Sequence, residues 1–312
     1  MGVFVFLPLV LPLSAWPVAR LAEQRLHPRA ATWLLSVVAG VLAVCSTLCL
    51  ALLVVVGTAQ LPGNPLPDGW SDPEVREAVP YDDVAGTAAI PALTAVLVSC
   101  ARLSWRHDRM RRRAGEALSA LPSRSVAVLP DRTPYAYALP GGLRGTGRVV
   151  VTTGMLAGLS ASERRALFAH ERAHLVGRHH RFLLVVRLAA LANPFLRPLR
   201  TAVTYTAERW ADEEAATAVG SRRVVARAIG KAGLVTRGAP IPTLAGFAAA
   251  GPVPRRVAAL LEPAPAVCVW PPVSTTVGLA AWGAAAGTTV SALSSANSAV
   301  TLFFILRAAT PL

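Results

Sequence analysis

Residues 166–180, ALFAHERAHLVGRHH, place His170, Glu171 and His174 in the spacing His-Glu-x-x-His. Residues four apart lie on one face of a helix, about 6 Å apart along its axis. Two imidazoles placed in this way can bind one zinc ion, each at about 2.0–2.1 Å. Glu171 then lies beside the metal, where it can take a proton from a water molecule. The stretch therefore predicts a metal-binding helix with Glu171 as the catalytic base.

The residues before this stretch predict a small sheet followed by a capped helix. Ser160 and Glu163 have the spacing of a capping box, which marks a helix start. Turn signals separate the upstream segments, and a basic helix is expected at 105–121. Three of these segments are expected to be short strands, at 125–130, 134–140 and 147–156. The metal-binding helix is thus expected in an α+β domain.

A third metal ligand has two candidates. His180 completes the longer pattern His-Glu-x-x-His-x-x-Gly-x-x-His, which is typical of metzincins. Metzincins place a methionine turn beneath the metal, but Met1, Met110 and Met155 all precede the motif. The stretch Arg178–Arg181 is also typical of a polar helix end at a membrane surface.

The second candidate lies in TAERWADEEA, residues 206–215. Glu208 and Asp212 are four apart on one helix face, so both can face the same site. A carboxylate added to two histidines leaves one zinc position open, as in catalytic zinc sites. Asp212 can then accept the free ring N–H of a ligating histidine. The alternative for this pair is a solvated acidic helix face, and we favour Glu208 as the ligand.

Composition indicates a membrane protein: 54% of the 312 residues are hydrophobic and 15% are charged. Within residues 1–104 we expect three transmembrane helices, at about 2–19, 32–57 and 84–103. Residues 105–264 form the only stretch typical of a globular domain. Residues 265–312 are expected to add a C-terminal transmembrane segment, either one kinked or tilted crossing or a shallow hairpin. The four cysteines lack the spacing of a zinc finger, so cysteine-bound zinc is not expected.

The charged residues predict the orientation. The net charge is +14, and no DNA- or RNA-binding motif accompanies it, so direct nucleic-acid binding is not expected. Arginines follow the first and third expected spans, whereas the loop 58–83 is acidic. By the positive-inside rule the N-terminus is outside and the globular domain is cytoplasmic. The apolar run 182–196 is short, contains Arg187 and breaks at Asn193-Pro194. We expect it to pack in the domain or dip into the inner leaflet, because a crossing would separate His174 from Glu208.

The segments YAYALPGG, RVVVTTGML, LSASERRALFAHERAHL and ERWADEEA, in this order, resemble the gluzincin core of the membrane peptidase families M48 and M56. The resemblance extends over about residues 125–262, and the later segment GPVPRRVAALLEP belongs to it. It implies an α-helical integral membrane protein with an inserted α+β zincin-like domain. It also implies one Zn²⁺ bound by His170, His174 and Glu208, with Glu171 as base and Asp212 in support. One departure is Tyr135, where many M48 members have Asn.

The resemblance implies a zinc metalloendopeptidase of the plasma (inner) membrane, with the lipid bilayer and a protein or peptide substrate as partners. The M56 reading implies regulatory proteolysis, with a cytoplasmic transcriptional repressor as a possible substrate. The 312 residues include no penicillin-binding domain like that of the β-lactam sensors in this family. The alternatives are an M48-like quality-control protease and a non-catalytic membrane scaffold. Substrate is expected to pair with a sheet edge near Tyr135–Leu139 or Val149–Thr153. Candidates for stabilising the oxyanion are Tyr205, Arg209 and His179.

Overall fold

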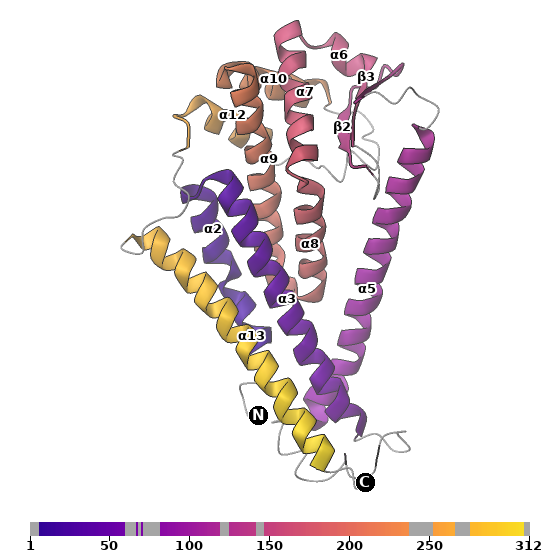
Figure 1. Cartoon of the computed structure of the whole chain (residues 1–312), viewed down its shortest axis with the longest axis vertical. Helices are drawn as coiled ribbons and strands as arrows, with labels where there is room; N and C mark the ends of the chain where they lie inside the picture. The colour runs from indigo at the N-terminus through magenta and orange to yellow at the C-terminus, as the bar shows by residue number, and fades with distance from the viewer. Residues whose placement is uncertain are drawn as a thin grey trace.

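Long helices run along the molecule, and a small sheet lies at one end of them (Figure 1). The computed structural model describes residues 6–59, 67, 70, 82–118, 125–141, 147–236, 252–265 and 275–308. Both chain ends lie at the opposite end from the sheet (Figure 1). Most of the acidic loop predicted at 58–83 falls outside the described residues.

Among the described residues, three helices are long and apolar enough to cross a membrane: α3 (Pro28–Ala59), α5 (Asp82–Ala117) and α13 (Thr276–Ala308). At 1.5 Å per residue, each exceeds the roughly 30 Å of a hydrocarbon core. The helices α3 and α5 touch where Gly57 meets Gly86, and a Cβ atom at either position would collide with the other backbone. The two glycines therefore set how closely these helices approach.

Two expectations about the membrane region differ from the structure. The predicted span 84–103 and the basic helix predicted at 105–121 are continuous in α5 as far as Ala117, because its arginine-rich half continues the helix without a breaker. Residues 119–121 lie outside the described residues. Residues 7–25 form three consecutive pieces, α1 (Leu7–Val10), η2 (Leu11–Ser14) and α2 (Ala15–Arg25). Prolines in this stretch each remove a backbone N–H from the helical ladder. None of the pieces is long enough to span alone, so a crossing at 2–19 stays a prediction.

The sheet contains β1 (Val126–Leu129), β2 (Ala136–Leu139) and β3 (Arg148–Thr152) in the order β1-β3-β2. The central strand β3 is parallel to β1 and antiparallel to β2. The strand predicted to reach residue 156 ends at Thr152. There, the Thr152 side chain accepts a hydrogen bond from the Met155 amide at 3.2 Å and starts the short helix α6 (Thr153–Ala157).

The predicted capping box is present at the start of α7 (Ala161–Val176), between Ser160 and Glu163. Glu163 also accepts a hydrogen bond from Lys231 of α10 (Arg222–Val235) at 2.8 Å. The helices α9 (Arg197–Val219) and α10 pack beside α7, and α12 (Val253–Leu261) packs on α10 and α9 (Figure 1). The start of α7 is thus fixed both by its own cap and by a neighbouring helix.

A helical hairpin connects the α7 region to the membrane helices. From α7 the chain descends through α8 (His179–Ala192), turns at η4 (Pro194–Leu196), and returns as α9 alongside α3 (Figure 1). At the turn, Asn193 donates to the Ser46 hydroxyl at 3.0 Å, near the middle of α3. Near the top, the hydroxyls of Thr32 and Thr206 lie 3.0 Å apart. The run 182–196 therefore turns back, and His174 and Glu208 lie at the same end of the molecule.

The hairpin and the membrane helices share one hydrophobic core. Its fully buried members include Leu35 of α3, Val186 of α8 and Leu199 of α9. Small residues of α2, such as Ala19, complete the packing. The sheet and the α7–α10–α12 region have separate apolar clusters. The hairpin thus packs on α3, whereas the cluster of the sheet includes Ala114 near the end of α5.

Candidate metal centre

His170 and His174 of α7 meet Glu208 of α9, and we call these three residues the metal centre. One possible ligand atom of each residue lies within 4.8 Å of those of the other two. Among the described residues, these three form the cluster of His, Cys, Asp or Glu side chains that could hold a metal ion. The Nε2 atoms of the histidines are 3.2 Å apart. Glu208 carboxylate oxygens lie 3.5 Å from His170 Nε2 and 3.4 Å from His174 Nε2. Ligands at about 2.0–2.1 Å from a tetrahedral zinc ion are about 3.4 Å apart. The donor set and its spacing therefore fit zinc.

The outward ring nitrogens of both histidines lie close to polar atoms of other side chains. Asp212 Oδ1 lies 3.0 Å from His170 Nδ1, as its spacing from Glu208 predicts. His179 Nδ1 lies 2.8 Å from His174 Nδ1. With His174 Nε2 directed to a metal, its Nδ1 would carry the proton and donate a hydrogen bond to His179 Nδ1. The sequence had suggested His179 only as an oxyanion candidate, so this contact is new.

The break between α7 and α8 brings His179 beneath His174. Arg178 has φ 52°, the one left-handed non-glycine residue in the described chain, and it turns α8 away from the axis of α7. The His179 ring then packs against Gly177, where any Cβ atom would collide with it. Burial lowers the pKa of His179 to about 2, so His179 stays neutral and able to accept a hydrogen bond. The sequence signal for this contact is the Gly-Arg-His that follows the motif.

Arg256 of α12 completes the centre and was missed in the sequence. Its guanidinium contacts the Glu208 carboxylate at 2.8 Å and both oxygens of Asp212, at 2.8 and 2.6 Å. Arg256 is only 4% exposed. Burying an unpaired guanidinium costs free energy, so the two carboxylates are needed to keep it in this position. The sequence did contain a signal that Arg256 is buried. Arg256 and Leu260 are four residues apart, so they lie on one face of an amphipathic helix, and Leu260 is buried.

The cluster carries more negative than positive charge. Glu171, Glu208 and Asp212 are all buried, and Arg256 is the guanidinium among them. Burial, reinforced by Glu208, raises the pKa of Glu171 to about 7. Burial opposes a proton on His170, but Asp212 and Glu208 outweigh it and raise the pKa of His170 to about 10. The site thus attracts protons, and a divalent cation would balance the excess charge in their place.

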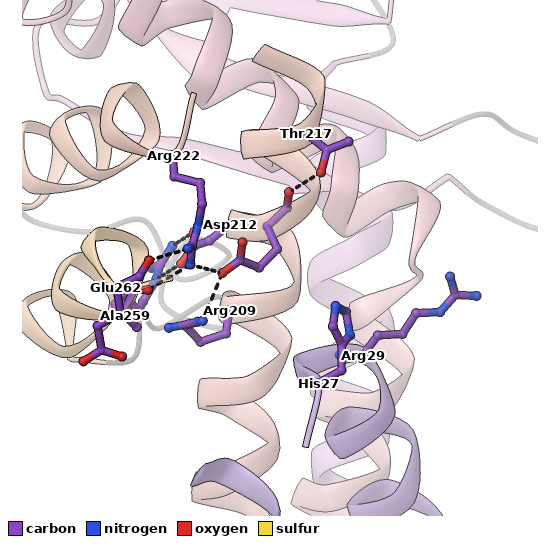
Figure 2. A network of polar contacts seen from close by, with 10 residues as sticks. His27, Arg29, Arg209, Asp212, Thr217, Arg222, Ala259 and Glu262 are labelled. Carbon is purple, nitrogen blue, oxygen red and sulfur yellow. Dashed lines mark hydrogen bonds and ion pairs between the residues drawn. The ribbon is translucent and has the colours of Figure 1, made fainter. Parts of the chain in front are cut away.

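A polar network next to the metal centre holds α12 against α9 (Figure 2). Arg222 donates to the carbonyls of Ala259 and Glu262 at the end of α12. The same guanidinium contacts Glu213 of α9 at 2.8 Å, and Arg209 contacts Glu213 at 3.0 Å. The network therefore fixes the helix that carries Arg256.

Two cavities meet at Glu171 and His174. The catalytic cavity, of about 200 Å³, lies between β2, α7, α10 and α12, and its lining includes Tyr135, Ala136 and Ile229. The side cavity, of about 80 Å³, lies between α5, β2 and α8. In both linings, as far as the structure describes them, the oxyanion candidates are missing. Arg209 forms an ion pair with Glu213. The Cζ atom of Arg255 lies 3.9 Å from the centroid of the Tyr205 ring. His179 contacts His174 on the side away from the proposed metal.

His180 lies apart from the metal centre and lines the side cavity. Its neighbours there include Arg111 of α5, and burial followed by the charge of Arg111 lowers the pKa of His180 to about 4. A position among arginines disfavours metal binding. The structure thus brings Glu208, and not His180, to the two motif histidines.

Comparisons with known proteins agree with this geometry. Residues 101–188 match the model of peptidase family M48. The match begins within α5 and includes His170, Glu171 and His174, but it ends before Glu208. No curated protein and no solved structure matches the chain. M48 peptidases are zinc metallopeptidases, so the match, together with the three apolar helices, supports a membrane-associated metalloprotease.

Proposed function

We propose that the chain is a zinc-dependent endopeptidase working at the membrane surface, with His170, His174 and Glu208 as ligands of one zinc ion. The observation that carries this proposal is the set of three donor atoms about 3.4 Å apart in a buried cluster with excess negative charge. The zincin-like fold of the domain belongs to the same proposal. The M48 match over the motif helix supports it.

Glu171 is the proposed base. A bound zinc ion supplies Lewis-acid polarisation of the scissile carbonyl and of the attacking water. Glu171 lines both cavities, takes the proton of that water, and passes it to the leaving amine. Asp212 and His179 hold the imidazoles in the orientation that directs both Nε2 atoms to one point.

Substrate is proposed to add to β2 as an extra strand. The central strand β3 is paired on both sides, whereas β2 pairs along one side only within the described residues. The Ala138 backbone hydrogen-bonds the Glu171 carboxyl, so this strand runs directly past the base. Of the two edges suggested by the sequence, the one near Tyr135–Leu139 is therefore favoured. An added strand extends on both sides of the scissile bond, which suits an endopeptidase.

The catalytic end is proposed to face the cytoplasm of a plasma (inner) membrane. Arg20, Arg25 and Arg29 precede or begin α3, and further arginines follow the apolar half of α5. A reporter fused after residue 120 should behave as cytoplasmic, and one inserted near residue 70 as external. Inverted signals would overturn the orientation.

Two substrate classes follow from the family resemblance. The M48 match supports cleavage of damaged membrane proteins in quality control. The M56-like alternative is regulatory cleavage of a cytoplasmic repressor. Proteomics of a deletion strain separates them, because quality control predicts accumulation of many membrane proteins and regulation predicts one intact repressor.

Metal removal tests the enzyme itself. The purified full chain should contain close to one zinc ion by mass spectrometry. A chelator should abolish its cleavage of a casein or peptide substrate, and added zinc should restore it. Full activity after verified zinc removal would contradict the proposal.

A further inference from the structure

The side cavity is hollow and opens directly beside the catalytic centre. Its lining combines apolar side chains of α7 and α8, such as Leu175, Leu183 and Leu184, with Glu171 and His174. Basic and imidazole side chains from α5 and α8 complete the lining: His107, Arg111, His180 and Arg187. Within the described lining, Glu171 is the only carboxylate, and it belongs to the catalytic machinery. The cavity is therefore apolar at one side and cationic at the other.

Two side chains in this lining each have a buried nitrogen that makes no hydrogen bond to the described residues. Arg111 donates from a terminal nitrogen to the Gly141 carbonyl at 2.9 Å, which orients its guanidinium. Its Nε atom is buried and has no hydrogen-bond partner within the described part of the chain, and the same holds for His180 Nδ1. Buried polar atoms of this kind are normally satisfied. Arg111 Nε can only donate, so it points to a missing acceptor, whereas His180 Nδ1 donates or accepts according to its tautomer. A carboxylate matches a guanidinium in both charge and geometry.

The strand β2 relates this cavity to the substrate. Tyr135 and Ala136, at its start, line the catalytic cavity, whereas Ala138 and Pro140, at its end, line the side cavity. Glu171 lines both, so a strand added along β2 passes from one cavity to the other over the base. Antiparallel pairing is the commoner arrangement of neighbouring strands. An antiparallel substrate would run from the side cavity toward the catalytic cavity, so the side cavity receives residues on the amino side of the scissile bond.

We propose that the side cavity is a specificity subsite for an acidic substrate side chain on the amino side of the cleaved bond, held by Arg111 and His180. The proposal rests on the proposed peptidase function. The leucines of the lining contact the methylene groups of the acidic residue, and Arg111 binds its carboxylate. The subsite selects among substrates, and Glu171 performs the chemistry.

A library of N-acetylated, C-amidated peptides tests the subsite, with cleavage sites read by mass spectrometry on the zinc-loaded full chain. Glu or Asp should be enriched within two positions on the amino side of the cleaved bond. For a matched Glu/Gln peptide pair, kcat/KM should favour Glu by about tenfold or more, as expected for a hydrogen bond to a charged group. Arg111→Gln should bring the Glu/Gln ratio of kcat/KM close to one, and this ratio is read within the same variant.

Arg112→Gln is the matched control, because Arg112 is the next residue of α5 and is exposed. It should keep the preference. Arg111→Glu should reverse it toward Lys or Arg at the same position. Cleavage without an acidic preference, or a preference that survives Arg111→Gln, would overturn the subsite and leave the peptidase standing. Failure of the zinc-loaded chain to cleave any peptide would overturn the proposed function and the subsite with it.

Discussion

The metal centre and the side cavity both contain histidines, yet their chemistry is opposite. His179 and His180 are neighbours in the chain, but His179 supports His174 among carboxylates, whereas His180 lies with Arg111. Excess negative charge in the first region favours a cation, and the basic groups of the second favour an anion. His180 fits a longer zinc motif and still lies among arginines, whose charge disfavours a cation. The charged neighbours of a histidine, more than its place in a motif, thus decide what it binds.

The sharpest test of the metal centre is Glu171→Gln. Gln has the size of Glu but cannot accept a proton from water at neutral pH, so cleavage should fall by about 10²–10⁴-fold. Zinc content should stay near one per chain, because Glu171 is a base and not a ligand in our proposal. Rates on a cleaved library peptide and metal analysis of the same sample measure both. Loss of zinc from this variant would show that Glu171 is a ligand.

The two regions should also differ in metal retention. Glu208→Ala removes a proposed zinc ligand. Losing a residue that only hydrogen-bonds a ligand costs up to about 100-fold in zinc affinity, so losing the ligand itself should cost more. His180→Ala should keep its zinc. Competition with a chelator of known affinity measures both, and thermal unfolding checks that each variant is folded. The reverse result would make His180 the third ligand.

His179→Phe tests the contact beneath His174. Phe keeps a ring against Trp210, whose centroid is 4.4 Å from that of His179, but removes the acceptor for His174 Nδ1. Zinc affinity should fall by about 10–100-fold. The matched variant His180→Phe should retain wild-type affinity. Equal losses in both variants would contradict the assigned difference between these neighbours.

The smallest expected effect concerns the capping box at the start of α7, the helix that contributes residues to both regions. The hydrogen bond from Lys231, aided by Ser160, lowers the pKa of Glu163 from 4.5 to about 2. The ionised form therefore stabilises the fold above pH 4.5, and this contribution is lost as the pH falls toward about 2. Glu163→Ala should lower stability by about 1 kcal/mol at pH 7, measured by unfolding in detergent.

Glu163→Gln is the control for this cap. It keeps a capping-box side chain but carries no charge, so it should lose less stability than Glu163→Ala and depend less on acid. Neither variant should change zinc affinity or the acidic preference. A pH-independent gap between wild type and Glu163→Ala would show that the charge is unimportant.

The sequence predicted the features whose signals are local. The cap at Ser160, the motif on α7 and the pair Glu208 and Asp212 each depend on spacing within one helix. The turn at Asn193 was also predictable, because a proline follows a short apolar run. These local rules gave the strands, though not the start of α6 at Thr153.

Features that depend on distant packing were missed. Arg256 reaches Asp212 across 44 residues, and its helix alone does not reveal which acid it meets. His179 contacts His174 only because Arg178 takes a left-handed conformation, which no motif requires. The side cavity joins α5 to α8, which are neighbours in space and separated by the whole sheet in the chain. Orientation in the membrane, the zinc ligands and the base stay predictions.

The helical hairpin has a consequence for biogenesis. Leu199 of α9 and Val186 of α8 bury their side chains against α3, and Asn193 bonds to Ser46 of the same helix. A chain beginning at residue 105 would lack α3, leaving these groups exposed to water and prone to aggregate. The hairpin can reach its final place only after α3 has been synthesised and inserted. If α3 spans the bilayer as we propose, the hairpin would complete its fold only at the membrane.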